Sequence, residues 1–195
     1  MERRLGPFRG GRTSLALLAK ELKPGDSLPT AESALISGSA AQTKRLGREL
    51  GQLLCPHDLI LLEGPLGGGK TCFVQGLAQG LGVRQTVISP SFTLVRQYAL
   101  DASLGWLYHI DLYRIQSAAE AWDFGLEEYL EGEGICVVEW AEKAMALWPA
   151  ERLHIRFQIL GSRRRGLAVL ASGARFVELL ERWPPLGEER DAASH

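Results

Sequence analysis

The residues Gly64-Pro65-Leu66-Gly67-Gly68-Gly69-Lys70-Thr71 carry the strongest structural signal in this sequence. They fit the phosphate-binding pattern Gly-x-x-x-x-Gly-Lys-Ser/Thr, known as the P-loop. Its glycines let main-chain N–H groups point at a phosphate, and the helix that follows directs its positive end at the same anion. Lys70 would reach the β- and γ-phosphates, and the Thr71 hydroxyl would ligate Mg²⁺. The pattern predicts that ATP or ADP with Mg²⁺ is bound by Leu66, Gly67, Gly68, Gly69, Lys70 and Thr71.

The sequence on either side of this loop has the secondary structure that a P-loop needs. Residues 58–63 (DLILLE) form an apolar run of strand length, and residues 71–81 show helical spacing that Gly82 ends. The same criteria predict strands at 92–100, 106–112, 135–140, 152–160 and 166–172, and helices at 40–54, 118–130 and 174–183. We therefore expect an α/β fold, a P-loop NTPase-like three-layer sandwich with a mixed, centrally parallel sheet.

Length and composition indicate one globular domain with short extensions. The chain has 195 residues, of which 46% are hydrophobic and 23% charged, and a formal net charge of -1. This balance excludes wholesale disorder and a basic field that attracts nucleic acid. No apolar run reaches the roughly 18 residues of a membrane span. We expect a flexible basic extension at residues 1–38 (alternatively a misplaced start or an organelle address), a P-loop ATPase domain at 39–183 and a polar tail at 184–195.

The cysteines indicate a reducing compartment. Cys55, Cys72 and Cys136 are odd in number, and no two of them have the Cys-x-x-Cys spacing of a zinc or redox site. Cys136 lies in an apolar run and is expected to be buried. This usage is typical of a cytoplasmic protein.

Two acids end apolar strands, where a P-loop protein presents its magnesium and water ligands. Asp111 follows Tyr108-His109-Ile110, and Glu139 follows Cys136-Val137-Val138. Because ligands bind at the carboxyl ends of parallel strands, both acids are expected beside the P-loop.

Several neighbouring features are open to more than one interpretation. The segment Ser89-Pro90-Ser91-Phe92-Thr93 either senses the nucleotide or is a polar turn. Trp140 covers the nucleotide, faces a partner, or simply packs in the core or on the surface. The run Arg163-Arg164-Arg165 is either a solvated turn or a contact to phosphate, adenine or RNA. We expect His109 to be a buried, hydrogen-bonded side chain rather than a base.

These motifs, in this order, resemble those of a known family. They are the P-loop, Ser89-Pro90-Ser91-Phe92-Thr93, His109-Ile110-Asp111-Leu112-Tyr113-Arg114, Gly125-Leu126-Glu127-Glu128-Tyr129 and Val138-Glu139-Trp140. Over about residues 38–172 the chain is similar to the bacterial TsaE (YjeE) family, the ATPases of tRNA threonylcarbamoyladenosine biosynthesis.

The resemblance implies an ATPase that is slow alone and acts with TsaB and TsaD, which modify the adenosine beside the tRNA anticodon. The tRNA would be reached only through that complex, and no membrane would be involved. By resemblance, Lys70 holds phosphates, Thr71 and Glu139 serve Mg²⁺, and Asp111 is the acid needed for hydrolysis. The family chain also approaches the nucleotide at the positions of Ala40, where it often has glutamate, and of the turn containing Gly161.

Two other functions fit a P-loop. A small-molecule kinase would need a mobile arginine-bearing lid, for which residues 163–165 are the candidate. A nucleotide-gated adaptor would bind ATP without useful turnover.

Overall fold

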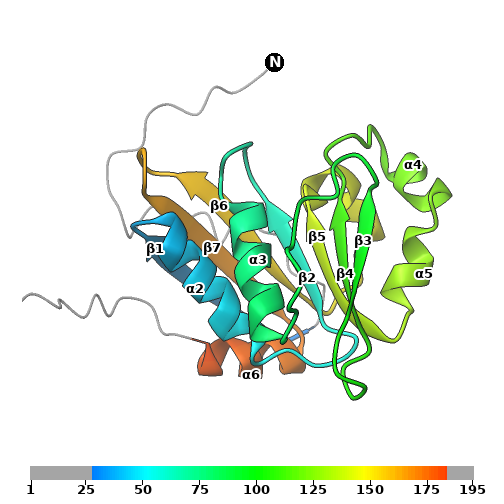
Figure 1. Cartoon of the computed structure of the whole chain (residues 1–195), viewed down its shortest axis with the longest axis horizontal. Coiled ribbons are helices and arrows are strands. Elements are labelled where there is room, and N and C mark those ends of the chain that lie inside the picture. The colour runs from blue at the N-terminus through cyan, green and yellow to red at the C-terminus, as the bar shows by residue number, and fades with distance from the viewer. Residues whose placement is uncertain (1–27, 184–195) are drawn as a thin grey trace, which may run out of the picture.

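The computed structural model describes residues 28–183, which form one seven-stranded sheet with helices around it (Figure 1). The strands are β1 (Thr30–Ser37), β2 (Leu59–Glu63), β3 (Val95–Ala99), β4 (Trp106–Asp111), β5 (Gly134–Glu139), β6 (Arg152–Ile159) and β7 (Arg165–Ser172). The helices are α2 (Ala40–Gly51), α3 (Lys70–Gly80), α4 (Ala118–Asp123), α5 (Leu126–Leu130), α6 (Ala174–Arg182) and the 3₁₀ helix η1 (Ala141–Leu147). Within this range, no helix combines the length and apolarity needed to span a membrane.

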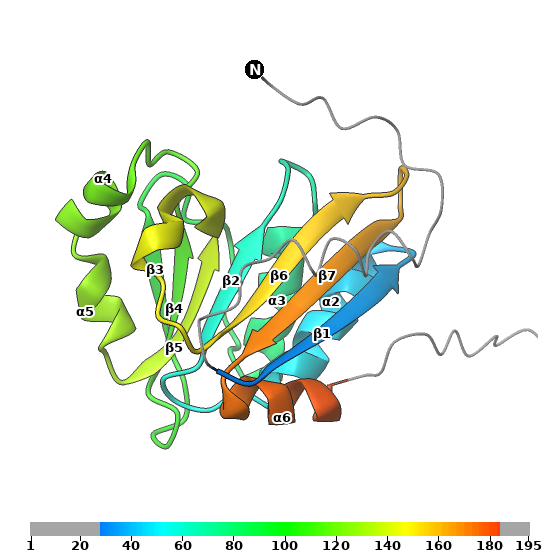
Figure 2. The ribbon, with the colours of Figure 1, turned by 180° about the vertical axis from the view of Figure 1, so that it is seen from behind.

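The sheet is parallel in its centre and antiparallel at both edges. Its strand order is β1-β7-β6-β2-β5-β4-β3. The pairs β6/β2, β2/β5 and β5/β4 are parallel, whereas β1/β7, β7/β6 and β4/β3 are antiparallel (Figure 2). Side chains on both faces of β2 are fully buried (Ile60, Leu61 and Leu62, each 0% exposed), which explains why its sequence is an uninterrupted apolar run. The predicted mixed, centrally parallel sheet is confirmed.

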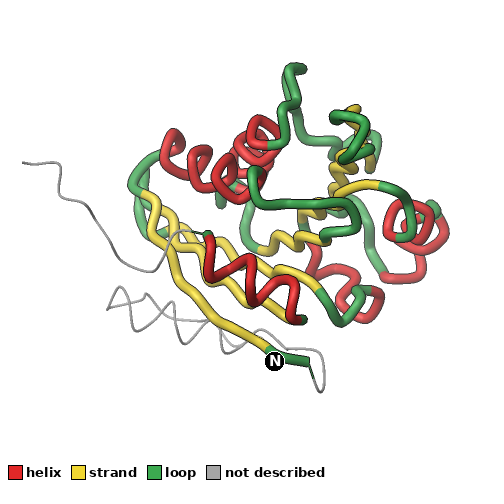
Figure 3. Tube along the Cα trace, turned by 90° about the horizontal axis from the view of Figure 1, so that it is seen from below, coloured by secondary structure: helices red, strands yellow, loops and turns green. Residues whose placement is uncertain are grey.

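Two hydrophobic cores lie on the two faces of the sheet. One joins β2, β5, β6 and β7 to α2, α3 and α6, and the other joins β2, β4 and β5 to α4, α5 and η1. Seen from below, helices lie on both sides of the strands (Figure 3). The predicted three-layer architecture is therefore confirmed.

Glycines let α2 and α3 pack with their backbones in contact. Gly47 and Gly51 of α2 face α3, and Gly76 and Gly80 of α3 face α2. A Cβ atom at Gly76 would lie 1.8 Å from the carbonyl oxygen of Lys44, and one at Gly47 would lie 2.1 Å from that of Phe73. This close packing fixes α3, which carries the P-loop lysine at its first residue, against its neighbour.

Two expectations from the sequence are corrected by the fold. Thr30–Ser37 pairs along its whole length with β7, so these residues belong to the sheet and not to an extension. The large apolar residues of this strand are Leu35 and Ile36, which are adjacent and not two apart, and this hides the strand period. The predicted helix at 118–130 is two helices, because Gly125 adopts a φ of 86° between α4 and α5. Residues 1–27 and the expected tail at 184–195 lie outside the described residues.

Candidate nucleotide-binding site

The P-loop leaves the end of β2, the central strand, and enters α3. Since β5 and β6 flank β2 on opposite sides, the loop lies at the carboxyl edge of the parallel strands, where α/β sheets bind ligands. Gly64 is required because a Cβ atom there would lie 2.5 Å from the carbonyl oxygen of Phe157. Gly69 has a φ of 103° and caps α3 without a side chain, so the capping residue itself takes none of the first N–H groups of that helix.

A cavity of about 480 Å³ lies in front of this loop. It unites the P-loop with the hydroxyl-rich segment and both strand-end acids that the sequence singled out. Its lining residues are Leu66, Gly67, Gly68, Gly69, Lys70, Thr71, Cys72, Ser89, Ser91, Phe92, Asp111, Tyr113, Arg114, Glu139 and Trp140. Arg114 and Lys70 are the cationic side chains among them.

Glu139 is in direct contact with the P-loop. Its Oε2 accepts a hydrogen bond of 3.0 Å from the Thr71 hydroxyl, although the two residues are 68 apart in the chain. Asp111 is the register partner of Glu139 across the β4/β5 pair. Both acids are almost completely buried (1% and 2% exposed), so their carboxylates are held close to the loop in an environment of limited solvent.

Hydroxyl groups hold the second acid in place. Asp111 Oδ2 accepts hydrogen bonds of 2.6 Å from Ser89 and from Ser91, and Oδ1 accepts one of 2.9 Å from the main-chain N–H of Tyr113. The segment at residues 89–93 therefore orients Asp111. The sequence signal for this role was the run of hydroxyls, but their partner was not predictable from it.

Lys70 lies between main-chain oxygens and an aromatic ring. Its Nζ donates to the carbonyl oxygens of Gly64 (2.5 Å) and Pro65 (3.1 Å) and lies 3.8 Å from the centre of the Trp140 ring. Burial lowers the pKa of Lys70, while the carboxylates of Glu139, Glu142 and Asp111 oppose this shift. Trp140, which has a φ of 61°, thus covers the lysine of the P-loop.

Glu142, which sequence reasoning missed, is a third acid near the loop. Burial raises the pKa of its carboxyl, and the charge of Glu63 adds to that effect, whereas hydrogen bonds from the main chain and the charge of Lys70 lower it. It lies in η1, an element that the sequence did not predict.

The two remaining predicted positions adjoin the P-loop rather than line the cavity. The Cys72 thiol donates to the carbonyl oxygen of Ala40 (3.2 Å), which places the start of α2 beside the first turn of α3. Arg165 bonds to the carbonyl oxygens of Gly67 (3.2 and 3.1 Å) and Gly161 (2.9 Å), so the β6–β7 turn is tied to the loop. Of the run at 163–165, Arg165 therefore contacts the site.

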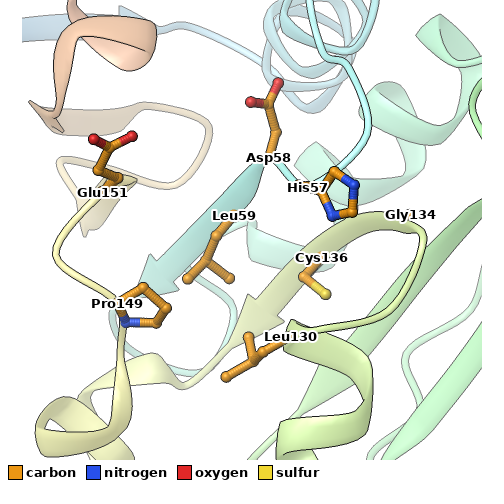
Figure 4. Close-up of a pocket in the computed structure, with 8 residues that line it drawn as sticks. All are labelled: His57, Asp58, Leu59, Leu130, Gly134, Cys136, Pro149 and Glu151. Atoms are coloured by element: carbon orange, nitrogen blue, oxygen red, sulfur yellow. The ribbon is translucent and has the colours of Figure 1, made fainter.

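A second, smaller cavity of about 190 Å³ lies at the opposite, amino ends of β2 and β5 (Figure 4). It is lined by His57, Asp58, Leu59, Leu130, Gly134, Cys136, Pro149 and Glu151. Its Asp58 carboxylate is paired with Arg175 (Nη2–Oδ2 2.7 Å), and its Cys136 thiol donates to the carbonyl oxygen of Tyr129. Burial raises the pKa of Cys136 to about 12, so this thiol is not a nucleophile near neutral pH. The chemistry-bearing residues predicted from the sequence gather at the larger cavity.

Comparison with known proteins agrees with this geometry. The family model described as "Threonylcarbamoyl adenosine biosynthesis protein TsaE" matches residues 37–166. The chain belongs to the TsaE family. The match includes the P-loop, both strand-end acids and the turn at Gly161, so the resemblance inferred from the motifs is confirmed.

Relatives of the family and one solved structure match most of the chain. The tRNA threonylcarbamoyladenosine biosynthesis protein TsaE of Bacillus subtilis (strain 168) is 41% identical over 140 residues, which cover 72% of this chain and 86% of that protein. The protein of the same name from Treponema pallidum is 39% identical over 134 residues, covering 69% and 97%. The crystal structure of Bacillus subtilis YdiB superimposes with a TM-score of 0.67 at 33% identity, covering 80% of this chain and 95% of that one.

Proposed function

We propose that this chain binds and hydrolyses ATP as the ATPase component of the cytoplasmic machinery that makes threonylcarbamoyladenosine in tRNA, acting with TsaB and TsaD. The observation that carries the proposal is the contact between Thr71 of the P-loop and Glu139 at the end of β5, in a chain of the TsaE family. The tRNA would be reached only through the TsaB–TsaD complex.

The residues around Thr71 fit Mg²⁺. A hydroxyl and a carboxylate 3.0 Å apart supply the oxygen ligands that this ion prefers. Within residues 28–183 there is no cluster of three or more His, Cys, Asp or Glu side chains that would form a complete metal cage. Mg²⁺ in nucleotide sites uses one or two protein ligands and takes the rest from phosphates and water, so Thr71 and Glu139 suffice. When bound, the ion would neutralise charge on the phosphates.

The other site residues bind the phosphates and orient the attacking water. Main-chain N–H groups of the P-loop and the amino end of α3 bind phosphate oxygens, and Lys70 adds a positive charge. Asp111, whose oxygens are held by Ser89, Ser91 and the Tyr113 N–H, orients the attacking water. Ala40 and the turn at Gly161 approach the nucleotide from the side of α2 and β7.

Partner-dependent activation follows from how open the cavity is. Leu66 and Phe92 line it and are 75% and 84% exposed, so the rim of the cavity is open to bulk water in the isolated chain. Electrostatic stabilisation of phosphoryl transfer is stronger where water is excluded. We therefore expect slow hydrolysis alone and faster hydrolysis when TsaB–TsaD covers this opening.

The proposal is tested by reconstituting tRNA modification with purified TsaB and TsaD, with and without this chain and ATP. We expect sustained modification only when both are present, together with faster ATP hydrolysis by the assembled complex than by the chain alone. Modification that is indifferent to the chain would contradict the proposal. Transfer of labelled γ-phosphate to a metabolite would instead indicate a kinase, and ATP binding without turnover in the complex would indicate an adaptor.

A further inference from the structure

His109 is the buried polar side chain of the site that the proposed function leaves without a role. It lies in β4, two residues before Asp111, and is 0% exposed. Its Nε2 lies 2.9 Å from Oε1 of Glu139, whose side chain is 3% exposed. A hydrogen bond between two side chains this deeply buried is not shared with water, so it restricts both of them.

The two oxygens of Glu139 have different partners. Oε1 faces His109 on the neighbouring strand, and Oε2 accepts from the Thr71 hydroxyl at 3.0 Å. Rotation of the carboxylate would therefore break a buried hydrogen bond at Oε1 as it moved Oε2 away from Thr71. The Thr71 contact alone would leave the carboxylate free to turn about its last torsion, which is broad for glutamate.

The partner of the ring indicates which nitrogen carries a proton. An ionised carboxylate only accepts hydrogen bonds, so Nε2 must carry a proton. Nδ1 is buried and has no hydrogen-bond partner among the residues that the structure describes. The geometry therefore places a proton on the ring nitrogen that faces Glu139.

The geometry points to His109 as a positioning residue for magnesium binding: it donates to Oε1 of Glu139 and thereby keeps Oε2 beside Thr71, where the Mg²⁺ of the nucleotide would be held. The inference rests on the proposed function in that Mg²⁺ and ATP are the ligands. Hydrogen bonds to metal-ligating side chains have this effect in other proteins, and their removal weakens metal binding about 10- to 100-fold.

The test compares two substitutions in the full chain. His109→Leu removes the donor and leaves an apolar side chain in a buried strand, whereas the amide of His109→Gln reaches the same place with an N–H group. ATP affinity is measured by calorimetry with Mg²⁺ and with EDTA. We expect His109→Leu to reduce the Mg²⁺-dependent gain in affinity at least about ten-fold, with the affinity in EDTA unchanged, and His109→Gln to restore most of it.

His154→Leu is the matched control, because His154 is also buried in the sheet (1% exposed) but lies beside Glu63 on β2. We expect this control to keep the Mg²⁺-dependent gain. An unchanged gain in His109→Leu, or an equal loss in the control, would overturn the inference.

A second measurement needs neither nucleotide nor metal. Long-range ¹H–¹⁵N correlation spectra of the histidine rings report which nitrogen is protonated. We expect His109 to show a proton on Nε2 that exchanges slowly, and a ring protonated on Nδ1 alone would overturn the inference. If the wild-type chain bound no ATP in the presence of Mg²⁺, the proposed function would fall, whereas the ring measurement would still decide whether His109 donates to Glu139.

Discussion

Under the proposed function, Lys70 is the residue whose charge matters most for binding phosphate. It is 4% exposed, and within the folded chain its ammonium group is balanced by nearby carboxylates and main-chain oxygens. We expect Lys70→Ala to weaken ATP binding about 10- to 100-fold, because a hydrogen bond to a charged group contributes about 1.5–3 kcal/mol. The dissociation constant is measured by calorimetry with Mg²⁺.

Arg84→Ala is the control for this substitution. Arg84 is exposed and follows the opposite end of α3. Its substitution by alanine therefore removes one positive charge at a position away from the P-loop. Burial lowers the pKa of Lys70, which means that the fold disfavours its charged form. We therefore expect Lys70→Ala to keep at least the wild-type thermal stability in the absence of nucleotide. Equal ATP affinity in wild type and Lys70→Ala would remove Lys70 from the site.

For single residues, the sequence predicted which side chains lie in the site better than it predicted which atoms they contact. The P-loop, Asp111 and Glu139 were predictable because their chemistry demands particular residues at strand ends. The bond from His109 to Glu139 was not, since it joins positions 30 apart on neighbouring strands. It depends on the register of β4 with β5, which no local pattern in the sequence specifies.

Between elements, a charged cluster ties β2 to β6 directly before the P-loop. Glu63 pairs with Arg156 (Oε1–Nε 2.9 Å), and His154 lies 3.1 Å from its other oxygen. Burial alone would raise the pKa of Glu63, but the hydrogen bonds and charges of His154 and Arg156 outweigh it and lower the pKa from its ordinary value of 4.5. The ionised form of Glu63 therefore stabilises the folded state.

This shift predicts a pH dependence of stability. A carboxyl group whose pKa is lower in the folded chain stabilises the fold above its unfolded pKa, and the contribution is lost as the pH falls through the folded value. We expect Glu63→Gln to lower the melting temperature at neutral pH and to reduce the further loss seen below about pH 4.5 in the wild type. Glu49→Gln, which removes an exposed ion pair with Arg45 (3.7 Å), is the control. It should change neither the melting temperature at neutral pH nor its loss at low pH. Identical pH profiles for Glu63→Gln and wild type would contradict this role.

The glycine faces of α2 and α3 predict an unusually severe effect of a small substitution. Alanine normally favours a helix by about 1 kcal/mol relative to glycine. At Gly76, however, the added methyl group would meet the Lys44 carbonyl at 1.8 Å, and neither backbone can move without displacing its helix. We expect Gly76→Ala to lower the free energy of unfolding by about 3 kcal/mol, measured by urea denaturation. Gly38→Ala, where the new atom would meet only the Gln42 side chain at 3.4 Å, should have little effect.

Helix packing of this kind explains why element types were predictable but their boundaries and contacts less so. Helical spacing in residues 40–54 and 71–81 identified α2 and α3. From the sequence alone, however, their glycines are weak helix formers, and nothing indicates that they lie where the two helices touch. Gly125, in contrast, does end a helix, although the helical pattern of the sequence runs continuously from Ala118 to Leu130. A glycine's role depends on what lies opposite it, and that is a property of the tertiary fold.

For the molecule as a whole, the edge strand β1 is an integral part of the described sheet. β1 pairs with β7 from Thr30↔Ser172 to Ser37↔Arg165, and its Leu35 is 7% exposed within the main core. Since β7 also begins with Arg165, which donates to the Gly67 carbonyl oxygen of the P-loop, β1 supports the strand that holds one side of the candidate site.

We therefore expect Leu35→Ala in the full chain to lower the free energy of unfolding by about 2–5 kcal/mol, as for other buried leucines. Thr30→Ala, at an exposed position of the same strand, is the control and should change it by less than about 0.5 kcal/mol. Both are measured by urea denaturation, with ATP affinity determined under native conditions. If residues up to 38 were an extension outside the domain, Leu35→Ala would change the free energy of unfolding as little as Thr30→Ala. That result would show that β1 does not contribute to the stability of the domain.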